Sequence, residues 1–364
     1  MSMGTTTPSI SLAADVDTIP GIDEATRVAL RRLRGRGFDE TNLSLHRQQL
    51  AAVLVLLYSD STGSIQVLLT TRSKSLRSHP GQTALPGGRI DEEDREPKVL
   101  WGAFREAYEE VGLPFPSSLI IDSDNDIPHI PNIHILCTLS PHISQWGIIV
   151  VPVVAYLSGP VSSSASSPPS HTYTLTPTLT LQANPTEVDR IFTHPLESIL
   201  DPFSPQSTLS SRDLAEKGSE DWPYDEELYN YTDRLYPQLG PNHNNNNDTT
   251  DNIPSSIYRM HRFRSVASPI KGLTAEILVC SLSQVFPSHS NLFVRRFVSY
   301  HHLSPSSLPS SFHLYPFINL SLHPFVLYRF LASSIPFYPS SSAQPTSPMP
   351  VLPPRRLSNT LLGR

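Results

Sequence analysis

The chain has 364 residues, with 36 prolines, an apolar share of 38% and a formal net charge of −6 at pH 7. The acidic balance gives no electrostatic support to binding a phosphate backbone, so a nucleic acid is not an expected partner. The two cysteines make no disulfide framework, and no apolar run is long enough to span a membrane.

The first 44 residues are interpreted as an N-terminal extension. Residues 1–20 are polar and are expected to be loose, and they lack the basic start and apolar stretch of a signal peptide. Residues 23–36 predict a short amphipathic helix with arginines on its exposed face. We interpret this helix as a solvated element packed on the edge of the following domain.

Two strands begin the main domain. Residues 50–58 are an unbroken apolar run, which is typical of a strand buried on both faces. Residues 60–63 predict a turn, and residues 65–71 predict the second strand of a hairpin. A loop with four cationic or near-cationic side chains follows: Arg72, Lys74, Arg77 and His79. From charge alone, this loop could be solvated or could hold phosphate oxygens.

The stretch from Leu85 to Leu113 joins a glycine loop to a helix. Pro97 suits the first helical turn, and Gly112 ends the helix. Gly87 and Gly88 let the backbone come close to a ligand. At roughly 100° per residue, three glutamates fall within an arc of about 100° on one helical face: Glu106, Glu109 and Glu110. Like charges on one face repel, and hard divalent cations such as Mg²⁺ or Mn²⁺ are suited to neutralise such oxygen ligands.

The second half of the chain gives weaker signals. It predicts strands at 117–121, 132–139, 148–157 and 257–264, a short helix at 184–191 and another from residue 268. Low-complexity insertions are expected near 158–180 and 204–256, the second with a disordered polar tip at 242–247. Residues 281–364 are rich in serine and proline, show no clear period and are expected to be a disordered tail.

The stretch around the glutamates resembles the Nudix box, the signature of Nudix hydrolases. The family pattern is a glycine, five residues, an acid, seven residues, and then Arg-Glu-apolar-any-Glu-Glu-any-Gly-apolar, which Arg105 to Leu113 match in full. Sixteen residues separate Gly88 from Arg105, three more than in the pattern. The early acid is Asp94 when counted from Gly88, whereas the position counted back from Arg105 is Pro97. The pattern therefore leaves the role of the early acid open.

A second stretch, 68–88, resembles the upstream signature of the coenzyme A diphosphatase branch of this family. That signature reads Leu-Leu-Thr-x-Arg-Ser-x-x-Leu-Arg-x-His-x-Gly and runs into Phe-Pro-Gly-Gly. The residues that match it are Leu68, Leu69, Thr70, Arg72, Ser73, Leu76, Arg77, His79 and Gly81. Leu85 stands where the branch has Phe. The segment around Glu187 and His194-Pro195-Leu196 also resembles the branch.

The resemblance implies the fold class. It covers about residues 45–280 and implies an α/β protein with the Nudix fold, an α/β/α sandwich around a mixed sheet. The extension 1–44 would precede this domain, the insertions would interrupt it, and the unassigned tail 281–364 would follow it.

The resemblance also implies a function: hydrolysis of the diphosphate of coenzyme A or its thioesters, dependent on Mg²⁺ or Mn²⁺. The metal ligands would be Glu106, Glu109 and Glu110. One of Glu109, Glu110 or Glu187 would take a proton from water, although Glu187 could equally be an ordinary solvated acid. Arg105 would orient the glutamates by salt bridges, Gly87 and Gly88 would shape the loop, and the substrate would be recognised by Arg72, Arg77 and His79.

Two alternatives stay open. A Nudix hydrolase of another nucleoside diphosphate derivative, such as NADH or ADP-ribose, would keep the three glutamates. A non-catalytic Nudix module would bind a nucleotide ligand without cleaving it. The eukaryotic branch is usually peroxisomal, but the chain ends Leu-Leu-Gly-Arg rather than in a Ser-Lys-Leu-type signal, and a cytoplasmic location is the other expectation.

Overall fold

The computed structural model describes residues 12–38, 50–121, 126–144, 146–159, 172–176, 179–203, 214–236 and 256–281. The chain divides into two units, Met1–His302 and Leu303–Arg364, and every described residue belongs to the first. The predicted polar tip at 242–247 and the predicted tail from residue 282 onward lie outside the described residues.

The helices of the described residues are α1 (Glu24–Arg34), α2 (Lys98–Val111), α3 (Leu196–Leu200) and α4 (Gly272–Glu276), with 3₁₀ turns at Val16–Thr18 and Ser117–Leu119 and a π-helical turn at Ile277–Ser281. The strands are β1 (Leu50–Ser59), β2 (Ile65–Arg72), β3 (Thr83–Ala84), β4 (Gly87–Arg89), β5 (Phe115–Pro116), β6 (His129–Ile130), β7 (Ile133–Thr138), β8 (His142–Ile143), β9 (Ile149–Leu157), β10 (Thr172–Thr176), β11 (Leu179–Gln182), β12 (Val188–Pro195), β13 (Tyr229–Tyr236), β14 (Ser256–Phe263) and β15 (Ile270–Lys271). In this part of the chain, no helix is both long and apolar enough to cross a membrane.

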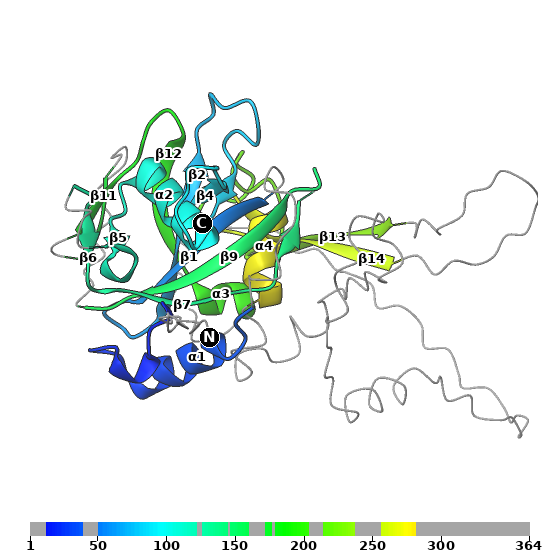
Figure 1. The fold of residues 1–364 in the computed structure, drawn as a ribbon. Helices are drawn as coiled ribbons and strands as arrows, with labels where there is room; N and C mark the ends of the chain where they lie inside the picture. Colours follow the sequence, from blue (N-terminus) through cyan, green and yellow to red (C-terminus); the bar gives the residue numbers. More distant parts are fainter. Residues whose placement is uncertain are drawn as a thin grey trace, which may run out of the picture. The chain divides into compact units, whose positions relative to one another are not determined.

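A mixed sheet with the strand order β12-β2-β1-β9-β7 forms the centre of the described structure (Figure 1). β1 is antiparallel to β2 and to the short strand β4, and it is parallel to β9. β9 is buried along its whole length and β1 along most of it, as their apolar runs predict. The predicted hairpin of the first two strands and the mixed character of the sheet are both confirmed.

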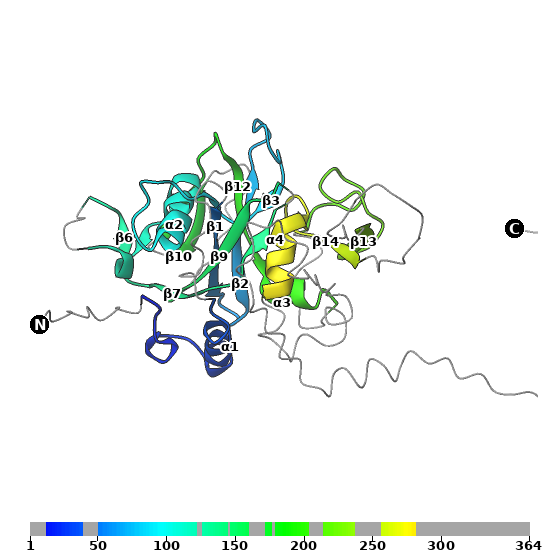
Figure 2. The same cartoon turned by 45° about the vertical axis from the view of Figure 1, so that its right-hand side comes forward.

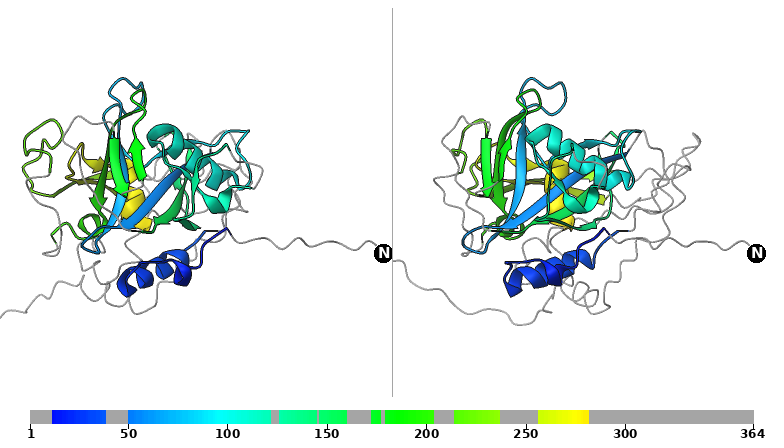
Figure 3. Two further views of the ribbon diagram at one scale, coloured as in Figure 1. Left: turned by 90° about the vertical axis from the view of Figure 1, so that its left-hand side faces the viewer. Right: turned by 60° about the vertical axis from the view of Figure 1, so that its left-hand side comes forward.

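Different helices cover the two faces of this sheet. Side chains alternate between the faces of a strand. In β1, Val55 and Leu57 join a core cluster that also contains residues of α1, α3 and α4. The alternate residues Leu54 and Leu56 are buried too, and α2 contacts β1, β4 and β9. Figures 2 and 3 show α2 and α4 on opposite sides of the sheet. These are the expected layers of an α/β/α sandwich.

The N-terminal extension contributes to the core, so the expectation of a loose segment at 1–20 is wrong for its described part. α1 confirms the helix predicted at 23–36. Val16 and Ile19 are fully buried in the core cluster that includes α1. The backbone N–H of Ala14 donates to a carbonyl of the edge strand β7. Two isolated apolar side chains show no period, so the sequence pattern could not reveal that they are buried.

Two other predicted elements have a different secondary structure. Residues 117–121, predicted as a strand, contain a 3₁₀ turn at Ser117–Leu119. Residues 184–191, predicted as a helix, form a turn that leads into β12. The Asn184 side chain accepts two hydrogen bonds from Thr186 and closes this turn. The residues that follow pair with β2, and this tertiary pairing overrides the local helical signal.

The two predicted insertions contain regular structure as well. β10 and β11 form a hairpin that begins within the region 158–180. β13 lies within 204–256 and pairs with β14, and Trp222 is fully buried. The strand predicted at 257–264 is β14, and the helix predicted from residue 268 begins at Gly272. Because both regions are polar in composition, the sequence pattern did not predict the strands that they contain.

Candidate metal and phosphate site

α2 carries the predicted glutamates and has the predicted ends. Pro97 precedes its first turn, and Gly112 ends it in the left-handed conformation, with φ 68°. Its apolar side is buried: Val99, Leu100, Ala103, Phe104, Ala107 and Val111. Glu106 is partly exposed and Glu109 exposed, whereas Glu110 is only 4% exposed. The three carboxylates therefore share one side of the helix but differ in their access to water.

The two glycines of the loop make room for different neighbours. Both belong to β4, which pairs with β1. A side chain at Gly87, where φ is 150°, would overlap the backbone of Ala52 and Val53. A side chain at Gly88 would overlap the carboxylate of Glu106. Gly87 is thus needed for strand pairing, and Gly88 leaves space for a predicted metal ligand.

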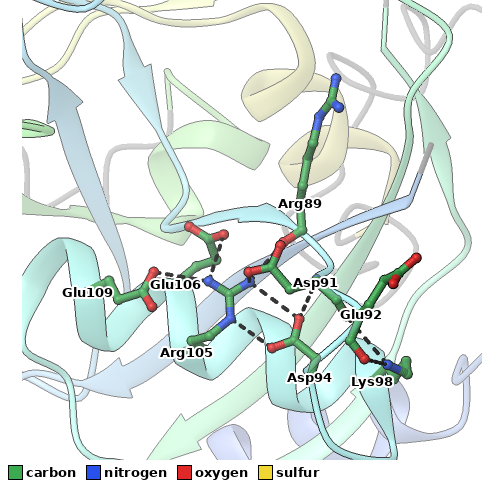
Figure 4. A network of polar contacts seen from close by, with 8 residues as sticks. All are labelled: Arg89, Asp91, Glu92, Asp94, Lys98, Arg105, Glu106 and Glu109. Carbon is green, nitrogen blue, oxygen red and sulfur yellow. Dashed lines mark hydrogen bonds and ion pairs between the residues drawn. The ribbon is translucent and has the colours of Figure 1, made fainter. Parts of the chain in front are cut away.

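Arg105 is enclosed by carboxylates at one end of the glutamate row, which we call the outer end (Figure 4). Its Nε donates to Asp94 at 2.7 Å, and its Nη1 donates to Glu106 at 3.1 Å and to Glu109 at 3.0 Å. Its Nη2 lies 3.5 Å from a carboxylate oxygen of Asp91. Burial lowers the pKa of Arg105, but the hydrogen bond to Asp94 and the surrounding negative charges outweigh it and raise the pKa above its ordinary value. Arg105 thus makes the salt bridges to Glu106 and Glu109 on which its predicted role depends.

Asp94, the early acid when counted from Gly88, contacts Arg105. Its side chain is 1% exposed, and besides binding Arg105 it accepts a hydrogen bond from the N–H of Asp91 at 2.7 Å. The longer stretch after Gly88 thus still delivers an acid to Arg105. Sequence reasoning missed Asp91, for which the acid-rich run 91–96 was the available signal.

Glu110 lies at the other end of the row, the inner end, where fewer groups compensate its charge. One carboxylate oxygen accepts a hydrogen bond from the N–H of Gly87 at 3.3 Å, and the other lies 4.0 Å from Nη1 of Arg72. Burial raises the pKa of Glu110, and the charges of Glu106 and Glu187 also raise it. Arg72 and the N–H of Gly87 offset only part of this effect, so the pKa rises to about 8. The negative charge at the inner end is therefore only partly neutralised by groups of the protein.

Glu187 reaches this cluster from a distant part of the sequence. The C=O of Glu187 accepts a hydrogen bond from the N–H of Ser73 at 2.8 Å, and the N–H of Asn184 donates to the C=O of Glu110 at 2.8 Å. Burial raises the pKa of Glu106, and the charge of Glu187 is one of those that raise it further. The turn before β12 therefore brings a fourth glutamate to the row on α2.

The remaining predicted residues are more exposed. Arg77 and His79 lie exposed on the loop between β2 and β3, and His79 has φ 53°. Within the described residues, no hydrogen bond or ion pair joins these two side chains to α2. The Glu109 side chain is 49% exposed and is held by Arg105. The structure thus brings Arg72, but not Arg77 or His79, next to the glutamates.

The carboxylate oxygens of this cluster are donors of the kind that a hard divalent cation prefers. Glu106 and Glu110 are carboxylates with raised pKa values, so a positive partner would stabilise their charged forms. Among the described residues, no group of three or more His, Cys, Asp or Glu side chains is already arranged to hold a metal ion. The predicted ligands Glu106, Glu109 and Glu110 lie on one side of α2, and the charge of Glu187 acts on Glu106 and Glu110.

Comparisons with known proteins match the part of the chain that contains β4 and α2. Residues 48–129 match the model of the NUDIX domain. The peroxisomal coenzyme A diphosphatase ndx-8 of Caenorhabditis elegans is 34% identical over 154 residues, which cover 42% of this chain and 52% of the relative. Nudix hydrolase 22, chloroplastic, of Arabidopsis thaliana is 35% identical over 135 residues, which cover 37% of this chain and 38% of the relative. The chain therefore spans about half the length, or less, of these curated relatives.

A solved structure of a Nudix hydrolase from M. smegmatis, RenU, aligns with 43% of this chain and 76% of its own, at 19% identity and a TM-score of 0.26. A likeness of that size carries no argument about function. The matched residues 48–129 contain α2 and two strands of the mixed sheet, β1 and β2. This chain contains a NUDIX domain within an α/β fold.

Proposed function

We propose that this protein hydrolyses the diphosphate bond of coenzyme A and its thioesters, giving 3′,5′-ADP and 4′-phosphopantetheine or its acylated form. The observation that carries the proposal is the contact between Arg72, which opens the signature loop, and Glu110 of the box helix. A group suited to phosphate thereby lies beside groups suited to a divalent cation. The similarity to the coenzyme A diphosphatase of C. elegans supports the choice of substrate.

We assign metal binding to Glu106, Glu109 and Glu110, with Mg²⁺ or Mn²⁺ as the cation that suits these oxygen donors. Nudix hydrolases generally use such metals. When bound, the cation neutralises the diphosphate oxygens and makes a water molecule more acidic. Arg105 and Asp94 would keep Glu106 and Glu109 oriented toward it.

The reaction adds one water across the diphosphate. The water oxygen bonds to one phosphorus, the bridging P–O bond breaks, and one proton must leave the water. We assign this proton to Glu109, Glu110 or Glu187, and we favour Glu187 as the acceptor. Glu109 is engaged by Arg105 and Glu110 is buried, whereas Glu187 is partly exposed at the edge of the same cluster.

Substrate recognition is divided between two positions in this proposal. Arg72 beside Glu110 would bind the diphosphate, which all candidate substrates share. Arg77 and His79 on the exposed loop would bind the 3′-phosphate, which coenzyme A has and NADH and ADP-ribose lack. Charge-assisted hydrogen bonds to phosphate contribute roughly 1.5–3 kcal/mol each, which is enough for about tenfold discrimination or more.

The test compares kcat/KM for coenzyme A, 3′-dephospho-coenzyme A, NADH and ADP-ribose at one fixed Mg²⁺ concentration. We expect coenzyme A to be cleaved at least about tenfold better than its dephospho form. Arg77→Gln should reduce the ratio of kcat/KM between coenzyme A and its dephospho form, whereas Arg72→Gln should slow the cleavage of all four compounds. Arg36→Gln, an exposed arginine after α1, is the matched control and should change neither.

Two results would replace this proposal. Faster hydrolysis of NADH or ADP-ribose would assign the protein to another nucleoside diphosphate derivative. Tight binding of coenzyme A without hydrolysis of any of the four compounds would identify a non-catalytic nucleotide-binding module.

For the compartment, we propose the peroxisome, because the C. elegans relative is a peroxisomal coenzyme A diphosphatase. The name of the Arabidopsis relative, Nudix hydrolase 22, refers to the chloroplast instead. Microscopy of the tagged full-length chain beside a peroxisomal marker tests this. A uniform cytoplasmic signal would reject it.

A further inference from the structure

We propose that Arg72 is a built-in counter-ion of Glu110, which competes with the divalent cation for this carboxylate in the substrate-free protein and binds substrate phosphate in the complex. Arg72 would then act with opposite sign on two binding events at one site. The inference rests on the proposed function, because it takes Glu110 as a metal ligand.

The contact between Arg72 and Glu110 is loose. Nη1 of Arg72 lies 4.0 Å from Oε1 of Glu110, the outer limit for an ion pair. The other carboxylate oxygen accepts a hydrogen bond from the N–H of Gly87 at 3.3 Å. Within the described residues, no hydrogen bond joins the guanidinium to the carboxylate. Arg72 therefore offsets the charge of Glu110 through space without filling its acceptor positions.

The backbone of Arg72 is fixed, whereas its guanidinium has an unused donor. The N–H of Arg72 donates to Gln82 at 2.9 Å, its C=O accepts from Gly81 at 3.0 Å, and it pairs with Val188 of β12. Its Nε is buried and has no hydrogen-bond partner among the described residues. Buried donors normally have an acceptor, and a phosphate oxygen is an acceptor of the right charge beside a cation site.

Electrostatics predicts opposite effects of Arg72 on metal binding in the empty site and on binding of the metal–substrate complex. A guanidinium at this distance from a ligand oxygen repels an incoming divalent cation and lowers its affinity. A diphosphate bound at the same place adds negative charge that attracts both the guanidinium and the cation. Removal of the Arg72 charge should therefore strengthen metal binding in the empty site and weaken the binding and turnover of the metal–substrate complex. A purely structural role would weaken both.

The experiment measures Mg²⁺ and Mn²⁺ affinity of the full-length chain without substrate, by calorimetry and by the electron paramagnetic resonance of free Mn²⁺. We expect Arg72→Gln to bind either ion at least about threefold more tightly than wild type. Arg72→Lys keeps the charge and should stay within about twofold, as should the control Arg77→Gln on the same loop. With coenzyme A and Mg²⁺, kcat/KM of Arg72→Gln should fall at least about tenfold, and Arg72→Lys should recover part of the loss.

Equal or weaker metal binding by Arg72→Gln would overturn the inference. If that variant does not unfold cooperatively, Arg72→Met keeps the apolar stem, and the rise in Tm on adding Mn²⁺ should exceed that of wild type; an equal or smaller rise would overturn it. The metal titration uses no substrate, so the two proposals fail separately. Tighter metal binding without coenzyme A hydrolysis rejects only the proposed function, and unchanged metal binding with intact hydrolysis rejects only the counter-ion role.

Discussion

The two ends of the glutamate row on α2 are neutralised in different ways. At the outer end, Arg105 makes hydrogen bonds to Asp94, Glu106 and Glu109 at 2.7–3.1 Å. At the inner end, Arg72 stands 4.0 Å from Glu110 and shares no hydrogen bond with it in the described structure. Each end has one arginine, but only the outer arginine is fully engaged by acids.

This difference suggests that the outer end stabilises the geometry of the site and that the inner end binds ligands. Partners fill the donor positions of the outer arginine, so this end can hold its geometry without a ligand. The inner end keeps a buried carboxylate whose pKa burial raises to about 8, and the site gains most from an added cation there. We therefore expect changes at the outer end to affect the framework as well as binding, and changes at the inner end to affect binding without weakening the framework.

The largest expected effect is on activity. Glu110→Gln and Glu109→Gln should each leave less than about a tenth of wild-type turnover, because an amide keeps the shape but not the charge that holds a hard cation. The two substitutions should also differ in their effect on the free energy of unfolding at about pH 9 without metal. Glu110→Gln removes a buried charge and should raise this free energy. Glu109→Gln removes a partner of Arg105 and should not raise it. Turnover assays and urea unfolding measure both, and turnover above that limit would place the metal elsewhere.

Substitutions at the two glycines of β4 should have different effects, one mainly on stability and the other mainly on metal binding. Gly87→Ala would overlap the backbone of β1 and should destabilise the protein by about 3 kcal/mol or more. Gly88→Ala would overlap the carboxylate of Glu106, a side-chain end that can shift, and should lower Mg²⁺ affinity at a smaller cost in stability. Denaturant unfolding and metal titration test the pair. The reverse order of destabilisation would contradict the observed packing of this loop.

Asp94→Asn tests the framework at the outer end. The substitution keeps the shape but removes a buried negative charge from Arg105, and we expect destabilisation of about 3 kcal/mol. Activity should fall less than in Glu110→Gln, because Asp94 touches Arg105 and not the substrate. Urea unfolding checks the prediction, with Asp126→Asn, an exposed acid, as the control. A loss below about 1 kcal/mol would mean that Arg105 is held without Asp94.

The pH dependence of unfolding tests the inner end without substituting a residue of the site. The folded pKa of Glu110, about 8, is raised from its ordinary value of 4.5. Its contribution to metal-free stability is therefore fully present below about 4.5 and is lost as pH rises through about 8. Urea unfolding in a chelator should show this decline, and saturating Mg²⁺ should oppose it. An identical decline in Glu110→Gln would assign the effect to another group.

The smallest expected effect is at the end of the chain. Residues 281–364 carry no recognised motif, and the chain divides into two units after His302. Removal of the second unit, Leu303–Arg364, should leave Mg²⁺ affinity and activity unchanged. Circular dichroism during heating, with both assays, tests this. Loss of cooperative unfolding would show that the tail supplies part of the core.

Local pattern determined the elements on which the site is built. The apolar runs at 50–58 and 148–157 specified buried strands, because a strand covered on both faces has no polar side. The 3.6-residue period, with Pro97 and Gly112 at the ends, specified α2 and put its glutamates on one side. These features depend on neighbours within a few residues, so the sequence alone was sufficient to predict them.

Contacts between distant segments decided the rest. The segment at 184–191 became a turn and a strand because β2 offered a pairing edge, and this pairing brought Glu187 to the row. Val16 and Ile19 became core residues because the sheet and α1 cover them. The sequence named Arg72 and Asp94 as candidates, but only the folded chain assigned Arg72 to Glu110 and Asp94 to Arg105. Such pairings depend on which strands meet across the sheet, and no local period encodes that choice.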